Sequence, residues 1–182
     1  MCSILYSFKR TAGCFIVKDM RPTSGKVLLA MFNVLGPLHG KKFLDLFAGS
    51  GQVAMEALRR GADAVCAVEA DKRRYAEMSA RLPGGIDALC MDVRRALPRF
   101  VKKGETFDII FADPPYNLGW GKEFPALMEE NSGVLASGGV IVLEHSARES
   151  IKEMSPEVWE RRERAYGGTV LSIFGRRSET DD

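Results

Sequence analysis

The tetrapeptide Asp113-Pro114-Pro115-Tyr116 follows residues 107–112, an apolar run typical of a buried strand. Its prolines fix the backbone and carry no N–H group, so the turn presents acceptors, the Asp113 carboxylate and the Pro114 carbonyl. With the flat Tyr116 ring beside them, these acceptors suit the exocyclic amino group of a planar base. The carboxylate can stabilise the positive charge that develops on such a nitrogen and take its proton. We therefore predict that Asp113, Pro114, Pro115 and Tyr116 are catalytic; the alternative is a rigid surface turn.

A glycine motif follows an earlier apolar run. Residues 49–54, Gly-Ser-Gly-Gln-Val-Ala, match the nucleotide-binding form Gly-x-Gly-x-x-Gly/Ala, and Glu69 ends the next apolar run. We expect Gly49 to allow a tight turn and Gly51 to let a ligand approach the backbone where a helix begins. Glu69 is placed to accept hydrogen bonds from ribose hydroxyls. The motif alone fits NAD(P), S-adenosylmethionine or a purely structural turn.

Asp45, just before this motif, favours one of these ligands. A dinucleotide would bring its pyrophosphate close to this carboxylate and be repelled, whereas S-adenosylmethionine carries an ammonium and a sulfonium, both cationic. The alternative for Asp45 is a carboxylate that braces the loop. Asp92 follows a third strand-like run, where it could bond an adenine amino group or cap the next helix.

Strand-like and helix-like segments alternate from residue 42 to residue 152. The apolar runs are continuous, as in strands covered on both faces, so we predict an α/β fold with a doubly wound, mostly parallel sheet. The last two strands, joined by a Gly167-Gly168 turn, should form an antiparallel edge pair, and a short helix should precede them. The expected strands are 42–47, 64–68, 87–91, 107–112, 140–143, 159–164 and 169–174. Ligands of such sheets bind beyond the carboxyl ends of the strands, where both motifs lie.

The composition is that of one globular domain. The chain has 182 residues, 46% hydrophobic and 27% charged, with a net charge of +2. It can bury a core unaided, and a disordered, collagen-like or coiled-coil chain is excluded. The cysteines lack CxxC or metal-ligand spacing, so we expect no metal and predict that Cys66 and Cys90 are buried, reduced thiols. Without an apolar run long enough for a membrane span or a secretory signal, we expect a cytoplasmic protein.

The two motifs together resemble those of class I S-adenosylmethionine-dependent methyltransferases that act on amino groups. With residues 20–23, Met-Arg-Pro-Thr, and Phe32-Asn33, the chain resembles the RsmD family, bacterial enzymes that methylate guanine N2 of 16S ribosomal RNA. The resemblance implies a Rossmann-like, seven-stranded methyltransferase domain over residues 20–177. Residues 1–19 would then be an extension or hairpin and residues 178–182 a polar tail.

The resemblance also implies roles for individual residues. The cofactor S-adenosylmethionine would be held by Asp45, Phe47, Gly49, Gly51, Glu69, Ala70, Asp92 and Val93. The target base would be held by the catalytic turn, with Arg21, Pro22, Thr23 and Tyr116 at the substrate mouth. The implied partner is 16S ribosomal RNA within a small-subunit ribonucleoprotein, with no membrane, and the protein is expected to be a monomer.

RNA contact would have to come from local basic stretches, because the net charge is small. The two candidates are Lys9, Arg10, Lys18, Arg21 and Lys26, and Arg94, Arg95, Arg99, Lys102 and Lys103. Either could instead be an ordinary solvated face. Three other functions stay open: an N-methyltransferase for DNA adenine, a protein amide or a small amine; a non-catalytic RNA-binding protein; and an NAD-dependent oxidoreductase, which Asp45 disfavours.

Overall fold

The computed structural model describes residues 25–116 and 118–177. The predictions for residues 1–19, for the tail 178–182, and for Arg21, Pro22 and Thr23 therefore lie outside the described residues. The proposed division of the chain into an extension, a methyltransferase domain and a tail stays a prediction.

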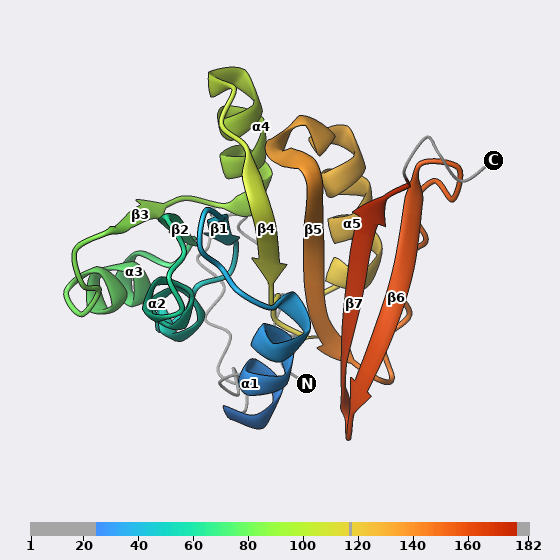
Figure 1. Ribbon diagram of the computed structural model, residues 1–182, viewed down its shortest axis with the longest axis horizontal. Coiled ribbons are helices and arrows are strands. Elements are labelled where there is room, and N and C mark those ends of the chain that lie inside the picture. The colour runs from blue at the N-terminus through green and yellow to red at the C-terminus, as the bar shows by residue number, and fades with distance from the viewer. Residues whose placement is uncertain (1–24, 117, 178–182) are drawn as a thin grey trace, which may run out of the picture.

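The centre of the fold is a seven-stranded sheet in the order β3-β2-β1-β4-β5-β7-β6 (Figure 1). The strands are β1 (Lys42–Asp45), β2 (Ala64–Glu69), β3 (Ile86–Cys90), β4 (Phe107–Ala112), β5 (Leu135–Ser146), β6 (Trp159–Tyr166) and β7 (Thr169–Arg176). Strands β1 to β5 pair in parallel, while β7 is antiparallel to both β5 and β6. The predicted α/β class and the antiparallel final pair are confirmed, with β7 inserted between β5 and the edge strand β6.

Helices cover both faces of the sheet and bury two apolar clusters. The helices are α1 (Gly25–Leu35), α2 (Gln52–Arg59), α3 (Lys72–Ser79), α4 (Val93–Lys103) and α5 (Trp120–Glu130). One cluster joins α1, α2 and α3 to the sheet through residues such as Phe32, Phe43 and Met78. The other joins α4 and α5 to the opposite face through residues such as Phe100 and Phe124. The continuous apolar runs of the strands supply both clusters, as expected for a sheet covered on both sides.

Helix starts beyond the strand ends are fixed by side-chain caps. Asp71 accepts hydrogen bonds from the backbone N–H groups of Arg73 and Arg74 at 3.0 and 2.9 Å, and begins α3. Asp92 accepts from the N–H of Arg94 at 2.8 Å and begins α4. These caps satisfy donors that a helix end leaves unpaired and hold both turns at the carboxyl edge of the sheet.

Two sequence predictions about local structure are wrong. Cys90 is exposed, although Cys66 is buried, because Cys90 ends the outermost strand β3, where no further strand covers it. Residues 147–158 contain no helix, and the chain passes through turns from β5 to β6. Within the described ranges no helix is long and apolar enough to cross a membrane.

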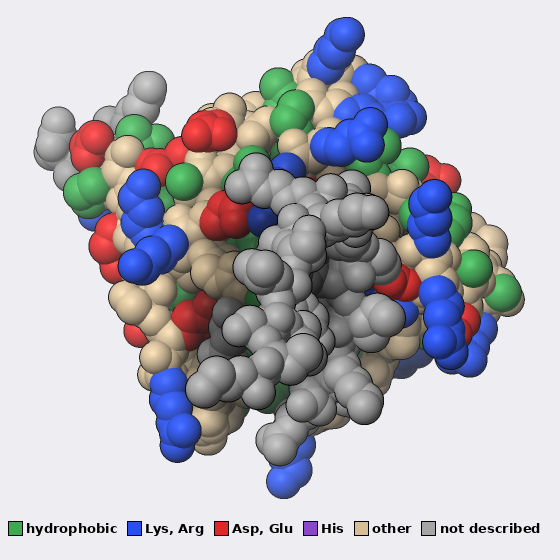
Figure 2. Space-filling model, turned by 180° about the vertical axis from the view of Figure 1, so that it is seen from behind, with side chains coloured by type: hydrophobic (Ala, Val, Ile, Leu, Met, Phe, Trp, Pro, Cys, Tyr) green, Lys and Arg blue, Asp and Glu red, His purple; other side chains and the backbone are tan. Residues whose placement is uncertain are grey.

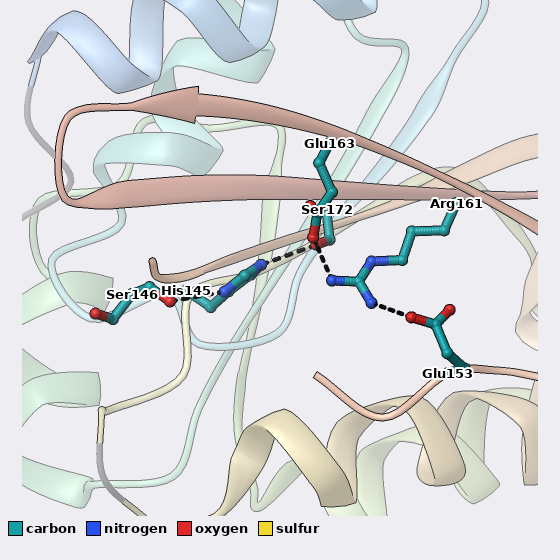
Figure 3. A network of polar contacts seen from close by, with 6 residues as sticks. All are labelled: His145, Ser146, Glu153, Arg161, Glu163 and Ser172. Atoms are coloured by element: carbon teal, nitrogen blue, oxygen red, sulfur yellow. Dashed lines mark hydrogen bonds and ion pairs between the residues drawn. The ribbon is translucent and has the colours of Figure 1, made fainter. Parts of the chain in front are cut away.

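His145 belongs to a polar network that ties β5, β7 and β6 together (Figure 3). Its Nε2 lies 2.8 Å from Oγ of Ser172, which donates to Glu163 at 3.2 Å. Glu163 pairs with Arg161, and Arg161 donates to Glu153 at 2.6 Å. His145 is therefore a core histidine that holds strands together, on the α4 and α5 side of the sheet.

Candidate active site

Four acidic residues gather at the carboxyl ends of β2, β1, β4 and β5. Asp45 is level with Ala67 of β2 and Phe111 of β4, and Ala112 of β4 is level with Leu143 of β5. Residues two apart along a strand face the same side, so the positions two beyond Ala67 and Phe111 share the face of Asp45. We call these four residues the acidic row, in sheet order Glu69, Asp45, Asp113 and Glu144.

Asp45 is the most deeply buried member of the acidic row, and none of its surface is exposed. Among the described residues, no donor makes a well-formed hydrogen bond to either of its carboxylate oxygens. Burial raises its pKa to about 8, helped by the nearby charges of Asp113 and Glu69, and the backbone N–H groups of Phe47 and Ala54 only partly oppose this rise. A buried carboxyl group with unused acceptor atoms is costly, so it favours a ligand that brings donors or positive charge.

Glu69 braces the glycine loop. One of its oxygens accepts a hydrogen bond from the Gly49 N–H at 3.0 Å, and the other accepts from the Asp71 N–H at 2.8 Å. Arg74 lies 3.2 Å from the second oxygen. The bonds expected from ribose hydroxyls would have to use the lone pairs that remain. Glu69 thus holds the loop after β1 and the loop after β2 in place, in addition to any contact that it makes with a ligand.

The contact predicted between Gly51 and a ligand stays a prediction, and the structure adds a second reason for a glycine at this position. Gly51 precedes α2 with φ of +79°, a conformation that favours glycine. A Cβ there would lie 2.9 Å from side-chain atoms of both Leu82 and Met78. Gly51 therefore lets the glycine loop lie close to these two side chains of α3 and its following turn. Gly49 also has a positive φ, of +54°, as its predicted tight turn requires.

An aromatic and ionic cluster that the sequence prediction missed lies on the α4 and α5 side of the sheet. Phe47 contacts Trp120 edge to face, with ring centroids 4.8 Å apart, and the Arg94 guanidinium lies 4.3 Å from the Trp120 centroid. Arg94 also makes a two-point ion pair with Glu123 and pairs with Asp92 at 3.2 Å. The cluster joins the loops after β1, β3 and β4. Regular spacing along one helix could not reveal it, because its members come from the loop after β1 and from the starts of two helices, α4 and α5.

Asp92 has the helix-capping role that was one of its two alternatives. Its side chain is bonded within its own turn, to the N–H and the guanidinium of Arg94. Of its predicted neighbours in the cofactor site, Val93 is buried in the core, whereas Ala70 is exposed. Contacts from Asp92, Val93 and Ala70 to a cofactor stay predictions.

The predicted catalytic turn lies where the sequence indicated, directly after β4. Pro114 is buried, and Asp113, Pro115 and Tyr116 are half-buried. Burial raises the pKa of Tyr116 to about 12, and the charges of Asp113 and Glu144 add to the rise, while Thr169 lowers it. The Tyr116 phenol therefore stays neutral and lies among Asp113, Glu144 and the start of β7.

Glu144 is the functional candidate that the sequence prediction missed. It immediately follows the apolar run 140–143, just as Glu69 and Asp113 follow theirs, so the same signal was present. No three of the described His, Cys, Asp or Glu side chains are grouped closely enough to hold a metal ion.

Two basic residues of α4, Arg99 and Lys103, lie away from the acidic row. Arg99 and Lys103 line a groove with Lys42 and Phe107, which are the first residues of β1 and β4. Figure 2 shows Lys and Arg side chains gathered at the end of the molecule to which α4 extends in Figure 1. Of the N-terminal stretch, only Lys26, which is exposed, belongs to the described residues.

Comparison with known proteins identifies the family. A family model described as conserved hypothetical protein 95 matches residues 10–175. "Ribosomal RNA small subunit methyltransferase D" of Escherichia coli is 30% identical over 165 residues, covering 88% of this chain and 81% of that protein. The chain belongs to the RsmD-type methyltransferase family. The resemblance stated from the two motifs is thereby confirmed.

Further similarities agree with this membership in the RsmD-type family. "Putative rRNA methyltransferase YlbH" of Bacillus subtilis is 33% identical over 177 residues, 94% of each chain. The solved structure "Putative methyltransferase yhhF from Escherichia coli" matches with a TM-score of 0.75 and 28% identity, over 88% of this chain and 89% of that one. The fold is thus shared with that solved structure over most of its length.

Proposed function

We propose that the protein transfers a methyl group from S-adenosylmethionine to the exocyclic N2 amino group of a guanine in 16S ribosomal RNA. Family membership supports the methyl transfer and the RNA substrate, since its relatives are named for ribosomal RNA methylation. The single observation that carries the proposal is the buried Asp45 carboxyl group at the glycine loop. A ribosomal substrate in turn implies a cytoplasmic site of action.

The site suits this cofactor better than a dinucleotide. Asp45, Glu69 and Asp113 bring acidic groups close together beside the loop. A cation placed there favours the ionised form of Asp45, whereas a pyrophosphate would face the charges of Glu69 and Asp113. Asp45 would face the cationic part of the cofactor, and the loop braced by Glu69 would hold the adenosine. The proposed cofactor contacts are Asp45, Phe47, Gly49, Gly51, Glu69, Ala70, Asp92 and Val93. S-adenosylmethionine supplies an electrophilic methyl group when bound.

The catalytic turn would act on the amino group of the base. Asp113 and the Pro114 carbonyl accept its two N–H groups, which turns the nitrogen lone pair toward the methyl donor. As the N–C bond forms, the nitrogen becomes positively charged and acidic. Asp113 stabilises this charge and accepts the proton, and the neutral Tyr116 ring stacks on the base. A base in structured RNA must first leave its stack to reach Asp113.

The experiment that tests the proposal offers labelled S-adenosylmethionine with small ribosomal subunits, free ribosomal RNA, DNA and protein in parallel. The proposal expects label in ribosomal RNA, from subunits or free RNA, and N2-methylguanosine after digestion to nucleosides. Label confined to DNA or protein would overturn the RNA substrate. Failure to bind S-adenosylhomocysteine, with binding of NADH instead, would overturn methyl transfer itself.

A further inference from the structure

We infer that Glu144 selects guanine by accepting a hydrogen bond from the ring N1–H next to the amino group held by Asp113. The inference rests on the proposed function and adds a specificity-determining residue to it. Glu144 lies outside both sequence motifs, in a strand that the motifs do not reach.

The sheet brings Glu144 beside Asp113. Ala112 of β4 and Leu143 of β5 are partners in a parallel pair, so the next residues, Asp113 just past the end of β4 and Glu144 still within β5, lie at the same level. Side chains at such neighbouring positions lie on the same face of the sheet. That face also carries Asp45, so Glu144 extends the acidic row away from the glycine loop and toward Tyr116.

The surroundings of Glu144 make it part of the base site. Its side chain is only 3% exposed, and it lies between Asp113 of the neighbouring strand and Leu171, its partner on β7. The charge of Glu144 acts on the Tyr116 phenol together with that of Asp113. Tyr116, Asp113 and Glu144 therefore lie near one another, and together they would offer a base a ring to stack on and two carboxylates at its edge.

The chemistry of the bases makes this second carboxylate selective. Guanine, adenine and cytosine all carry an exocyclic amino group, but only guanine has a ring N–H on the neighbouring nitrogen. In adenine and cytosine that nitrogen carries a lone pair, which an ionised carboxylate repels. With Asp113 on the amino group and Glu144 on the neighbouring ring position, guanine satisfies both acceptors. In the other two bases, the ring nitrogen would be an acceptor facing the buried Glu144 carboxylate, which is also an acceptor, and this arrangement is costly.

A base analogue tests the inference directly. 2-Aminopurine keeps the 2-amino group of guanine but has a lone pair at N1 instead of a hydrogen. Once the methylated guanine has been mapped, semisynthetic ribosomal RNA can carry guanine or 2-aminopurine at that position. We expect the wild-type protein to methylate the guanine RNA at least tenfold faster. Equal rates on both RNAs would overturn the role of Glu144.

The variant Glu144→Gln adds a readout that a purely structural role would not change. Its amide can present either an oxygen or an N–H, so the preference for guanine over 2-aminopurine should fall at least tenfold. A ratio of two rates from one preparation does not depend on how much of the variant is folded. Glu149→Gln is the matched control, because Glu149 also acts on the Tyr116 phenol but lies beyond the end of β5. This variant should keep the wild-type ratio of the rates on guanine and 2-aminopurine RNA.

The possible failures are distinguishable. If Glu144→Gln slows both RNAs by the same factor, Glu144 does not read the base and this inference is wrong, while the proposed function stands. If the wild-type protein labels adenine, selection by Glu144 and the guanine target both fail. If it labels no RNA, the proposed substrate fails, and the inference fails with it.

Discussion

Glu69 at the end of β2 accepts a hydrogen bond from the backbone N–H of Gly49, in the loop that follows β1. Its other oxygen accepts from the Asp71 N–H, so one buried carboxylate holds the loops of two neighbouring strands. In Glu69→Gln, the amide can accept only one of these bonds and turns an N–H toward the other donor. We expect the free energy of unfolding to fall by about 1–3 kcal/mol, and cofactor affinity to weaken with it.

Urea denaturation measures the first effect, and calorimetric titration with S-adenosylhomocysteine measures the second. Glu77→Gln is the matched control, because it removes an exposed ion pair with Arg73 on α3. That control should change stability by less than about 0.5 kcal/mol. If Glu69→Gln were as stable as the control, the bracing role would be wrong.

The raised pKa of Asp45 makes stability depend on pH. The folded protein holds this proton to about pH 8, whereas the unfolded chain releases it near its usual value of 3.8. The stabilisation from protonated Asp45 is therefore complete below the unfolded value and is lost as pH rises toward about 8. Asp45→Asn has no proton to lose. Its stability relative to the wild type should rise by up to about 1.4 kcal/mol for each pH unit in this window.

Urea denaturation of both proteins at several pH values checks this prediction. A difference between them that stayed constant with pH would contradict the raised pKa.

Asp45 also links cofactor binding to proton release. Below about pH 8 the carboxyl group is protonated, and a bound cation favours its ionised form. We expect up to one proton to leave as S-adenosylmethionine binds at pH 7. Calorimetry in buffers of different ionisation enthalpy counts the released protons, and Asp45→Asn should release fewer and bind more weakly. Equal proton release by both proteins would mean that another group is responsible.

The Arg94–Glu123 ion pair joins the start of α4 to the start of α5, beside Trp120. Its hydrogen bond holds the pKa of Glu123 below its usual range. Both side chains are more than a third exposed, so solvent screens the pair. A double-mutant cycle with Arg94→Ala and Glu123→Ala should give a coupling energy of about 0.5–1 kcal/mol, which high salt reduces. A coupling energy of zero at low salt would mean that the pair does not join the two loops.

The sequence predicted the elements of the fold well where its signal was continuous. The apolar runs 42–47, 64–68 and 107–112 gave β1, β2 and β4 to within two residues, because strands buried on both faces need such runs. The insertion of β7 between β5 and β6 was not predictable in the same way, since pairing between strands is not written in local periodicity. The exposure of Cys90 likewise depends on β3 lying at an edge of the sheet.

For the site, the sequence indicated residue types but not their mutual contacts. Asp45 was predicted as an acidic residue at a strand end, and only the structure gives its complete burial. Gly51 was explained by a ligand, whereas its neighbours Leu82 and Met78 come from a later helix and turn. Glu144 carried the same signal as Glu69 and Asp113, an acidic residue after an apolar run, but only the pairing of β5 with β4 puts it beside Asp113.

The central claim is that Asp113 holds the target amine, while Asp45 and Glu69, at the glycine-loop end of the acidic row, hold the methyl donor. The most direct test is Asp113→Ala, assayed for both methyl transfer to small ribosomal subunits and affinity for S-adenosylhomocysteine. The account predicts that transfer falls about 10²–10⁴-fold while affinity changes little. Transfer at the wild-type rate, or loss of cofactor affinity in step with loss of transfer, would contradict it.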